Sequence, residues 1–294
     1  MQLRVLSGKT FFVTIEKIID LIIINNLVNI GSFRKLFIKL KKTKIKMLRI
    51  NKYLAKCDLG SRRQVESLIK NGDIKINGIV CTDLSKQIDP AKDTVEFKGK
   101  KISFSDEKIY LMLNKPKKYL VTKRDDFDRK TVYDLIPDFG THIFPIGRLD
   151  YMSEGLLLLT NNGDFAQQVI HPRYKLPKLY KVTVKGNLDS NQIKQLRKGV
   201  LLDDKKTMPA LVYVKKRTQN TTILKMTIFE GRKRQIRYML KKVDSEVLEL
   251  KRLQIGDVKL GKLPVGMWRI LKPSEVMKLT KFSKFGKFIN IRGK

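Results

Sequence analysis

The sequence predicts an α+β protein, in which a small helix–helix–hairpin module precedes a larger domain on a largely antiparallel mixed sheet with flanking helices. The first observation is a pair of short helical patterns followed by an Asn-Gly turn between residues 50 and 78. The second is a series of strand-like segments with interspersed helices after residue 109, without strict βαβ alternation. The third is length: 294 residues with 42% hydrophobic content can build two domains.

The small module spans residues 47–105. The apolar residues of its first segment recur at the i, i+3, i+4, i+7 spacing of an amphipathic helix: Ile50, Tyr53, Leu54 and Cys57. Ser61 and Gln64 have the spacing of a capping box, in which each side chain satisfies the other's backbone N–H. We therefore expect a second helix over residues 62–71, ended by Gly72.

A hairpin completes the module. Residues 73–76 alternate in polarity and lead into Asn77-Gly78, a strong two-residue turn signal. The polar faces carry four basic residues, Lys52, Arg62, Arg63 and Lys70. Their pattern fits an ordinary solvated surface and an RNA-binding surface about equally, and both interpretations stay open.

The larger domain spans residues 106–277. Segments 110–113, 181–184 and 222–229 are rich in apolar or β-branched residues and are expected to be strands. Segments 191–198 and 234–242 have helical spacing. The chain contains no internal repeat and no glycine-rich phosphate loop. These features exclude solenoids and the common nucleotide-binding folds.

Charge indicates the class of partner. The chain has 63 Lys and Arg against 28 Asp and Glu, a formal net charge of +35. AT-rich coding is an alternative that would raise the number of lysines, but it would not explain why acidic residues are scarce. A field of this sign attracts polyanions, and we therefore favour a nucleic-acid partner.

The two ends differ from the rest. Residues 1–46 contain a short apolar stretch, which polar residues interrupt, and then a basic run. The apolar stretch is too short and too polar for a membrane span, which needs roughly 20 apolar residues. An organelle transit peptide and a start codon assigned upstream of Met47 are both compatible with this pattern. The expected location is accordingly the cytoplasm of a bacterial-type cell, or an organelle. Residues 278–294 interleave phenylalanines with lysines, as in an RNA-contacting tail or a frayed basic terminus.

Cysteine and histidine are scarce. Cys57 and Cys81 are too few and too far apart for a zinc site or a disulfide framework, which indicates a reducing compartment. With only His142 and His171, a multi-histidine metal centre is not expected either.

Residues 144–172 are the segment in which catalytic chemistry is expected. Gly147 permits an unusual backbone turn, and Asp150 follows it on a loop just before the apolar run 155–160. Asn161-Asn162-Gly163 then has the composition of a turn. An arbitrary aspartate in the position of Asp150 would be expected to pair with Arg148 or to cap a helix. The full string around it changes that interpretation.

Two resemblances cover nearly everything from Met47 to Met277. Residues 49–80, RINKYLAKCDLGSRRQVESLIKNGDIKINGIV, resemble an S4 domain, a small RNA-binding module. The strings GRLD and GLLLLTN resemble the central motif of pseudouridine synthases of the RsuA/RluB branch, which act on ribosomal RNA. The segments KLYKVTV (178–184) and EGRKRQIRYML (230–240) resemble two further motifs of that family, and NKP (114–116) and KTVYDLIP (130–137) also match.

Three positions depart from the family pattern. Ser153 stands where threonine is usual and keeps the hydroxyl, and Asn162 replaces a common aspartate. Lys118 stands where glycine is frequent, which bears on the conformation of its loop.

The resemblance implies the chemistry. Uridine becomes pseudouridine when the uracil is detached from the ribose, turned and rejoined through C5. Asp150 would act as the nucleophile at C1′ or as the base that removes a ribose proton. Arg237 would keep that carboxylate charged, because a nearby guanidinium opposes the effect of desolvation. Tyr180 would face the uracil, and Arg148 would fill the stack vacated by the extruded base.

The partner implied is ribosomal RNA, bound by a monomer without a metal or an organic cofactor. The segment 130–137 and the C-terminal region favour large-subunit RNA, with small-subunit RNA as the alternative. A non-catalytic ribosome-assembly protein is the rival from another functional class. The combination of Asp150, Tyr180 and Arg237 argues against it.

We predict that removing the module of residues 47–105 chiefly weakens RNA binding, while the rest of the chain still unfolds cooperatively. Binding by the full chain should fall steeply with salt, because Lys and Arg contacts release counterions from phosphates. Replacing Lys52, Arg62, Arg63 and Lys70 together by alanine should flatten that slope. Affinities for an rRNA fragment across a salt series measure this. Identical slopes for all three proteins would place RNA binding elsewhere.

Overall fold

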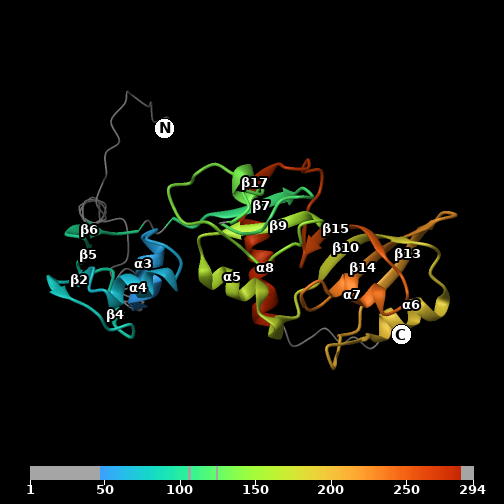
Figure 1. The fold of residues 1–294 in the computed structure, drawn as a ribbon, viewed down its shortest axis with the longest axis horizontal. Helices are drawn as coiled ribbons and strands as arrows, with labels where there is room; N and C mark the ends of the chain where they lie inside the picture. The colour runs from blue at the N-terminus through green and yellow to red at the C-terminus, as the bar shows by residue number, and fades with distance from the viewer. Residues whose placement is uncertain (1–46, 105–106, 124, 286–294) are drawn as a thin grey trace, which may run out of the picture.

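The computed structural model describes residues 47–104, 107–123 and 125–285 of the chain. The predictions for residues 1–46 and for the last nine residues lie outside this part. A small module stands at one end of the molecule, and a larger domain with a long twisted sheet forms the rest (Figure 1). The predicted α+β organisation is confirmed.

The module is built as the sequence predicts. Its helices are α3 (Ile50–Lys56) and α4 (Gln64–Lys70). The capping box is present: Gln64 N donates to Ser61 Oγ at 3.3 Å, and Ser61 N donates to Gln64 Oε1 at 2.9 Å. Its strands are β1 (Leu48–Arg49), β2 (Ile74–Ile76), β3 (Ile79–Val80), β4 (Gln87–Ile88), β5 (Val95–Phe97) and β6 (Lys100–Ile102).

The predicted hairpin joins β2 to β3. Asn77 and Gly78 both have left-handed backbone conformations, with φ of 52° and 82° respectively, as a two-residue hairpin turn requires. The helices and strands share one core, in which six side chains are fully buried: Ile50, Leu54, Val65, Ile69, Ile74 and Ile88.

The larger domain is organised around a nine-stranded mixed sheet. Seven strands follow the order β13-β14-β10-β15-β9-β7-β17, while β16 pairs with β15 and β8 with β9. In that order the seven are Leu211–Arg217, Thr221–Ile228, Lys178–Lys185, Val247–Ile255, Glu154–Thr160, Tyr110–Lys115 and Trp268–Ile270. β8 is Phe144–Pro145 and β16 is Val258–Lys259, and a separate hairpin pairs β11 (Leu201–Leu202) with β12 (Lys205–Lys206). All pairings between named strands are antiparallel except that of β15 with β9.

Helices cover the two halves of this sheet separately (Figure 1). Buried residues of α6 (Ser190–Lys198) and α7 (Gln235–Lys241) join a core with the β10–β14 half, whereas α5 (Gly163–Ile170) and α8 (Pro273–Phe285) share a core with β9. Two 3-10 turns, Val132–Leu135 and Pro172–Tyr174, complete the domain. In β9, Leu157 and Leu159 enter the first core, and Leu156 and Leu158 enter the second. Burial of both faces explains its continuous apolar run.

The two halves of the sheet meet at a short parallel contact. β15 pairs with β9 only at Lys251 with Glu154 and at Arg252 with Gly155. Gly155 has φ of 108°, and a Cβ there would lie 2.3 Å from the carbonyl oxygen of Arg252. Only glycine permits this approach. The loop that carries Asp150 enters β9 directly at this junction.

Two local predictions are corrected. Residues 161–163 do not form an isolated turn: Asn162 is the N-cap of α5, and its Oδ1 accepts from the backbone N–H groups of Asp164 and Phe165. The domain does not end at Met277, because α8 continues to Phe285 and Leu279 is fully buried. The lysines of this segment obscured its apolar face. No helix in the described ranges is long and apolar enough to cross a membrane.

We expect Gly155→Ala to lower the free energy of unfolding by about 3 kcal/mol, because a left-handed φ and an overlap with backbone act together. Gly186→Ala is the matched control: Gly186 also has a positive φ of 75°, but a Cβ added there would have no atom within 4 Å. It should cost about 1 kcal/mol. Denaturant unfolding of both variants measures the difference. Equal losses would mean that the close approach at Gly155 carries no special constraint.

Candidate active site

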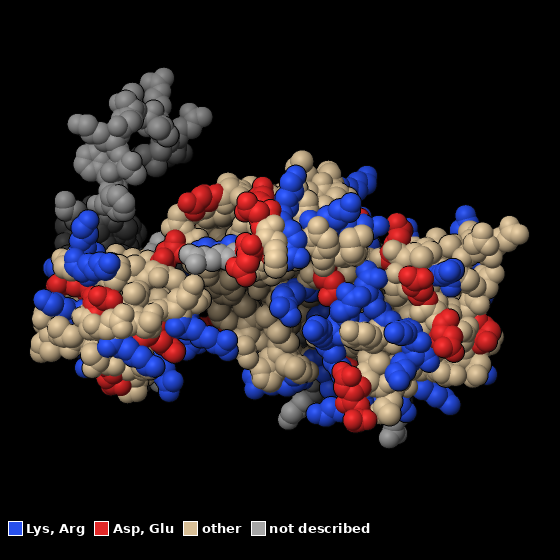
Figure 2. Space-filling model, viewed as in Figure 1, with Lys and Arg blue, Asp and Glu red and all other residues tan. Residues whose placement is uncertain are grey.

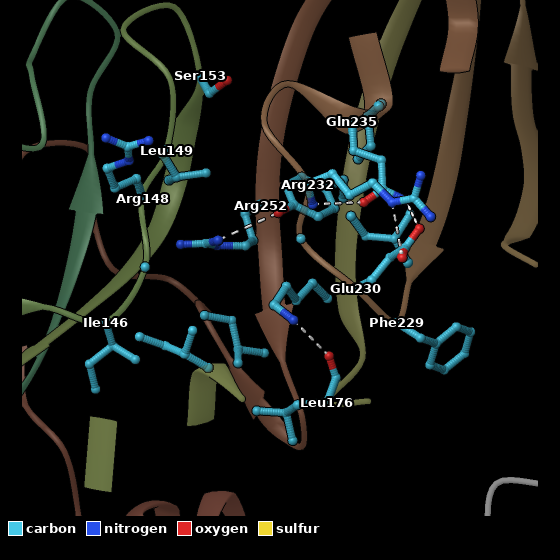
Figure 3. A pocket seen from close by; sticks show the side chains of 18 of the residues that line it. Ile146, Arg148, Leu149, Ser153, Leu176, Phe229, Glu230, Arg232, Gln235 and Arg252 are labelled. Carbon is cyan, nitrogen blue, oxygen red and sulfur yellow. Dashed lines mark hydrogen bonds and ion pairs between the residues drawn. The ribbon is translucent and has the colours of Figure 1, made fainter. Parts of the chain in front are cut away.

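A cavity of about 240 Å³ lies beside the junction of β9 and β15, between the loop that enters β9 and the end of β15; we call this place the fork. Its walls come from loop 146–153, the start of β10, segment 228–236 and the end of β15. In Figure 3, Arg148 and Leu149 lie on one side and Glu230, Arg232 and Gln235 on the other, with Arg252 between them. Asp150, Tyr180 and Arg148, three of the predicted site residues, line this cavity.

The backbone around Asp150 is held by a buried lysine. The Lys115 side chain has no exposed surface, and its Nζ donates to the carbonyl oxygens of Pro116 (2.9 Å), Asp150 (3.2 Å), Tyr151 (3.4 Å) and Ser153 (2.9 Å). Burial lowers the pKa of Lys115 to about 8, although the carboxylates of Asp150 and Glu154 oppose this shift. One side chain thus fixes the loop that carries the candidate catalytic carboxylate.

The loop after β7 also holds the backbone of the loop that carries Asp150. Lys118 N donates to the carbonyl oxygen of Tyr151 at 2.8 Å. Lys118 has φ of 63°, a left-handed conformation that glycine adopts without strain. The lysine at this position therefore adopts a backbone conformation that favours glycine.

Arg237 approaches Asp150 from α7. Its Nε lies 3.9 Å from Asp150 Oδ2, and its side chain and that of Asp150 are 16% and 31% exposed. Arg237 also donates to the carbonyl oxygens of Val247 (3.1 Å) and Met152 (3.5 Å). Burial and the neighbouring Arg234 lower the pKa of Arg237, and Asp150 opposes them. The contact is a loose ion pair between groups that are both largely withdrawn from water.

Tyr180 comes from the centre of the sheet. It lies on β10 with only 7% of its surface exposed, opposite Met226 on β14 and Arg252 on β15. The hydroxyl of Tyr180 accepts a hydrogen bond from Arg252 Nη1 at 3.4 Å, and Arg252 Nε donates to the carbonyl oxygen of Leu156 at 2.7 Å. The phenol therefore reaches the cavity from a rigid strand.

Two further cations that line the cavity, Lys178 and Arg252, were not predicted from the sequence as site residues. Lys178 donates to the carbonyl oxygen of Leu176 at 3.0 Å, and burial together with Arg252 lowers its pKa to about 8. It belongs to the same KLYKVTV segment as Tyr180, so the motif contained a signal. Arg252 is 4% exposed, but in the sequence it resembles any other charged residue on a strand. Its burial follows from a pairing that the local pattern does not reveal.

The four basic residues of the module do not reach the cavity. Arg63 and Lys70 are exposed, and Arg62 Nη2 donates to Asn51 Oδ1 at 3.3 Å. Lys52 Nζ lies 2.8 Å from Asp164 Oδ1 on α5, so this residue is already paired with the larger domain. Other Lys and Arg side chains gather over and beside α7 on the face shown in Figure 2.

Comparison with known proteins identifies the family and the fold. The RNA pseudouridylate synthase family matches residues 109–242, and the S4 domain family matches residues 48–95. An RNA pseudouridine synthase of Aquifex aeolicus, named as uncharacterized, is 41% identical over 235 residues, which cover 80% of this chain and 94% of that protein. This chain belongs to the RNA pseudouridine synthase family.

Further relatives agree. Ribosomal large subunit pseudouridine synthase B of Bacillus subtilis is 39% identical over 244 residues, covering 82% of this chain and 99% of the relative. A crystal structure of a pseudouridylate synthase superposes with a TM-score of 0.58 at 30% identity, covering 79% of this chain and 99% of the other. The predicted resemblance, the two-domain fold and the enzyme class, an isomerase acting on RNA, are confirmed.

We predict that Arg237→Ala lowers the rate of pseudouridine formation by about 100-fold, because it leaves Asp150 without its counter-charge. Arg232→Ala is the matched control in the same segment. Arg232 donates to Glu230 and to the carbonyl oxygens of Lys205 and Lys206, but it does not contact Asp150.

The Arg232 variant should therefore lose less activity than the Arg237 variant. Single-turnover rates at saturating enzyme, measured with the RNA affinity of each variant, separate chemistry from binding. If both variants lose the same activity, and lose it only through weaker RNA binding, Arg237 has no special role.

Proposed function

We propose that this enzyme converts a specific uridine of ribosomal RNA, in the large subunit, to pseudouridine, with Asp150 as the catalytic carboxylate. The observation that carries the proposal is the cavity that Asp150 and Tyr180 both line, with Arg237 beside Asp150. The name of the Bacillus subtilis relative supports large-subunit RNA as the target. The compartment proposed is one that contains ribosomal RNA of the bacterial type, the bacterial cytoplasm or an organelle.

The reaction is an isomerisation, so substrate and product contain the same atoms. It requires one catalytic carboxylate. The bond between N1 and C1′ breaks, a bond between C5 and C1′ forms, and the hydrogen of C5 is replaced by one on N1. Asp150 begins this sequence as the nucleophile at C1′ or as the base that removes a ribose proton. Both routes need an ionised carboxylate. Arg237 favours that state through its positive charge.

Tyr180 and Arg148 have different roles in substrate placement. The Tyr180 ring is held in β10 and offers the uracil a flat surface at the cavity wall. A uridine within folded RNA reaches this wall only after extrusion from its stack, which costs a few kcal/mol. Arg148 is exposed at the same loop and is the candidate to occupy the vacated position.

The S4 module supplies affinity at a distance from the chemistry. Lys52, Arg62, Arg63 and Lys70 lie outside the cavity, as expected of residues that bind phosphates rather than the reacting base. Lys52 exchanges its contact with Asp164 for a phosphate when RNA binds. Every proposed catalytic side chain comes from one chain, and a monomer is therefore sufficient.

Mapping of pseudouridines in ribosomal RNA tests the proposal. We expect a single large-subunit position to lose pseudouridine when the gene is removed and to regain it with the wild-type gene. Asp150→Asn should not restore it, because the amide keeps the volume but is neither an anionic nucleophile nor a base. RNA affinity of this variant should stay nearly unchanged.

Asp257→Asn, at an exposed carboxylate in the turn between β15 and β16, is the matched control and should restore the modification. Loss of a small-subunit position instead would assign the enzyme to the alternative target. An unchanged map in both subunits would contradict ribosomal RNA as the substrate. Appreciable turnover by pure Asp150→Asn would rule out Asp150 as the catalytic group.

A further inference from the structure

Arg252 is a buried cation that has no role in the reaction proposed above. Only 4% of its surface is exposed, and it forms no ion pair with a carboxylate in the described ranges. Lys115 and Lys178 lie close enough for the charge of Arg252 to lower their pKa values. A charge held in the interior without an opposite charge is strongly unfavourable, so its retention at this position requires an explanation.

The contacts of Arg252 lie at the fork of the sheet. Its Nε donates to the carbonyl oxygen of Leu156 on β9 at 2.7 Å, and its Nη1 donates to the Tyr180 hydroxyl on β10 at 3.4 Å. Nη2 is buried and has no partner among the described residues. An unsatisfied buried donor costs about 1–3 kcal/mol, so Arg252 is not explained by a complete set of structural hydrogen bonds.

The direction of the bond to Tyr180 has a chemical consequence. A guanidinium only donates, so the Tyr180 oxygen must accept and cannot direct its own hydrogen toward Arg252. The hydroxyl has no other hydrogen-bond partner in the described part of the chain. Its hydrogen is therefore available on the cavity side, where Tyr180 meets the substrate.

We infer that Arg252 is a positioning residue for Tyr180: it anchors the phenol oxygen at the fork and directs the O–H as a donor into the cavity. The inference rests on the proposed function, since it assigns a partner to one residue of that site. It also predicts that the contribution of Arg252 to the rate depends on the Tyr180 hydroxyl. A purely structural role at the β9–β15 junction would not depend on that hydroxyl.

A double-mutant cycle tests this dependence. Single-turnover rates on the ribosomal RNA fragment are measured at saturating enzyme for the wild type, Arg252→Gln, Tyr180→Phe and the double variant. We expect Arg252→Gln to slow the wild type by a factor at least about tenfold larger than the factor by which it slows Tyr180→Phe. The Kd for RNA should change little, and Arg252→Lys should recover part of the rate by restoring one donor.

Arg197→Gln is the control for loss of an arginine that binds a strand carbonyl. Arg197 Nε and Nη2 both donate to the carbonyl oxygen of Val212, at 3.0 and 2.7 Å, outside the cavity. Its loss should lower thermal stability without the coupling to Tyr180. Thermal unfolding of every variant is measured in parallel, and the cycle is run with Arg252→Lys if Arg252→Gln does not fold.

Equal fold losses from the Arg252 substitution in the two Tyr180 backgrounds would overturn the inference and leave the enzyme's proposed function intact. A wild-type enzyme that forms no pseudouridine in ribosomal RNA would instead overturn the proposed function. The two failures are therefore distinguished by the wild-type rate alone.

Discussion

The site depends on the close approach of β9 and β15 at Gly155. The two strands meet over only two residue pairs, and a Cβ at Gly155 would overlap the carbonyl group of Arg252. This junction joins a half-sheet that leads from the Asp150 loop to a half-sheet that contains Tyr180. The strands pair nowhere else, and the cavity lies at this fork, between the loop that enters β9 and the end of β15. Catalytic groups from distant parts of the sequence thereby meet: Tyr180 lies on β10, and Asp150 lies on the loop that enters β9.

Three of the cations near this fork hold or face parts of the site. Lys115 fixes the Asp150 loop through four carbonyl oxygens, Arg252 holds Leu156 and Tyr180, and Arg237 stands beside the carboxylate. Burial lowers the pKa of Lys115 to about 8, which reflects the cost of placing positive charge there. Most hydrogen bonds from these cations go to neutral carbonyl oxygens rather than to the Asp150 carboxylate. That carboxylate is therefore left partly exposed and open to substrate. Structural and catalytic charges are thus separated within one small region.

The sequence predicted the features that depend only on residues close together in the chain. The Ser61–Gln64 capping box, the Asn77-Gly78 hairpin and the buried run of β9 are all confirmed. Arg252 could not be identified, because its burial depends on pairing with Gly155, which lies far earlier in the chain. The last turns of α8 were missed because lysines interrupt the apolar pattern, although Leu279 is fully buried. Long-range pairing and tertiary burial are the information that a short window lacks.

The most direct test is a structure of Asp150→Asn bound to a large-subunit RNA fragment that contains the mapped uridine. We predict that this uridine is extruded, with its base against Tyr180 and its C1′ next to residue 150. The S4 module should contact phosphates of the same RNA. A target uridine that remains stacked in the RNA, or a base bound outside the cavity at the fork, would contradict the assignment of this cavity as the active site.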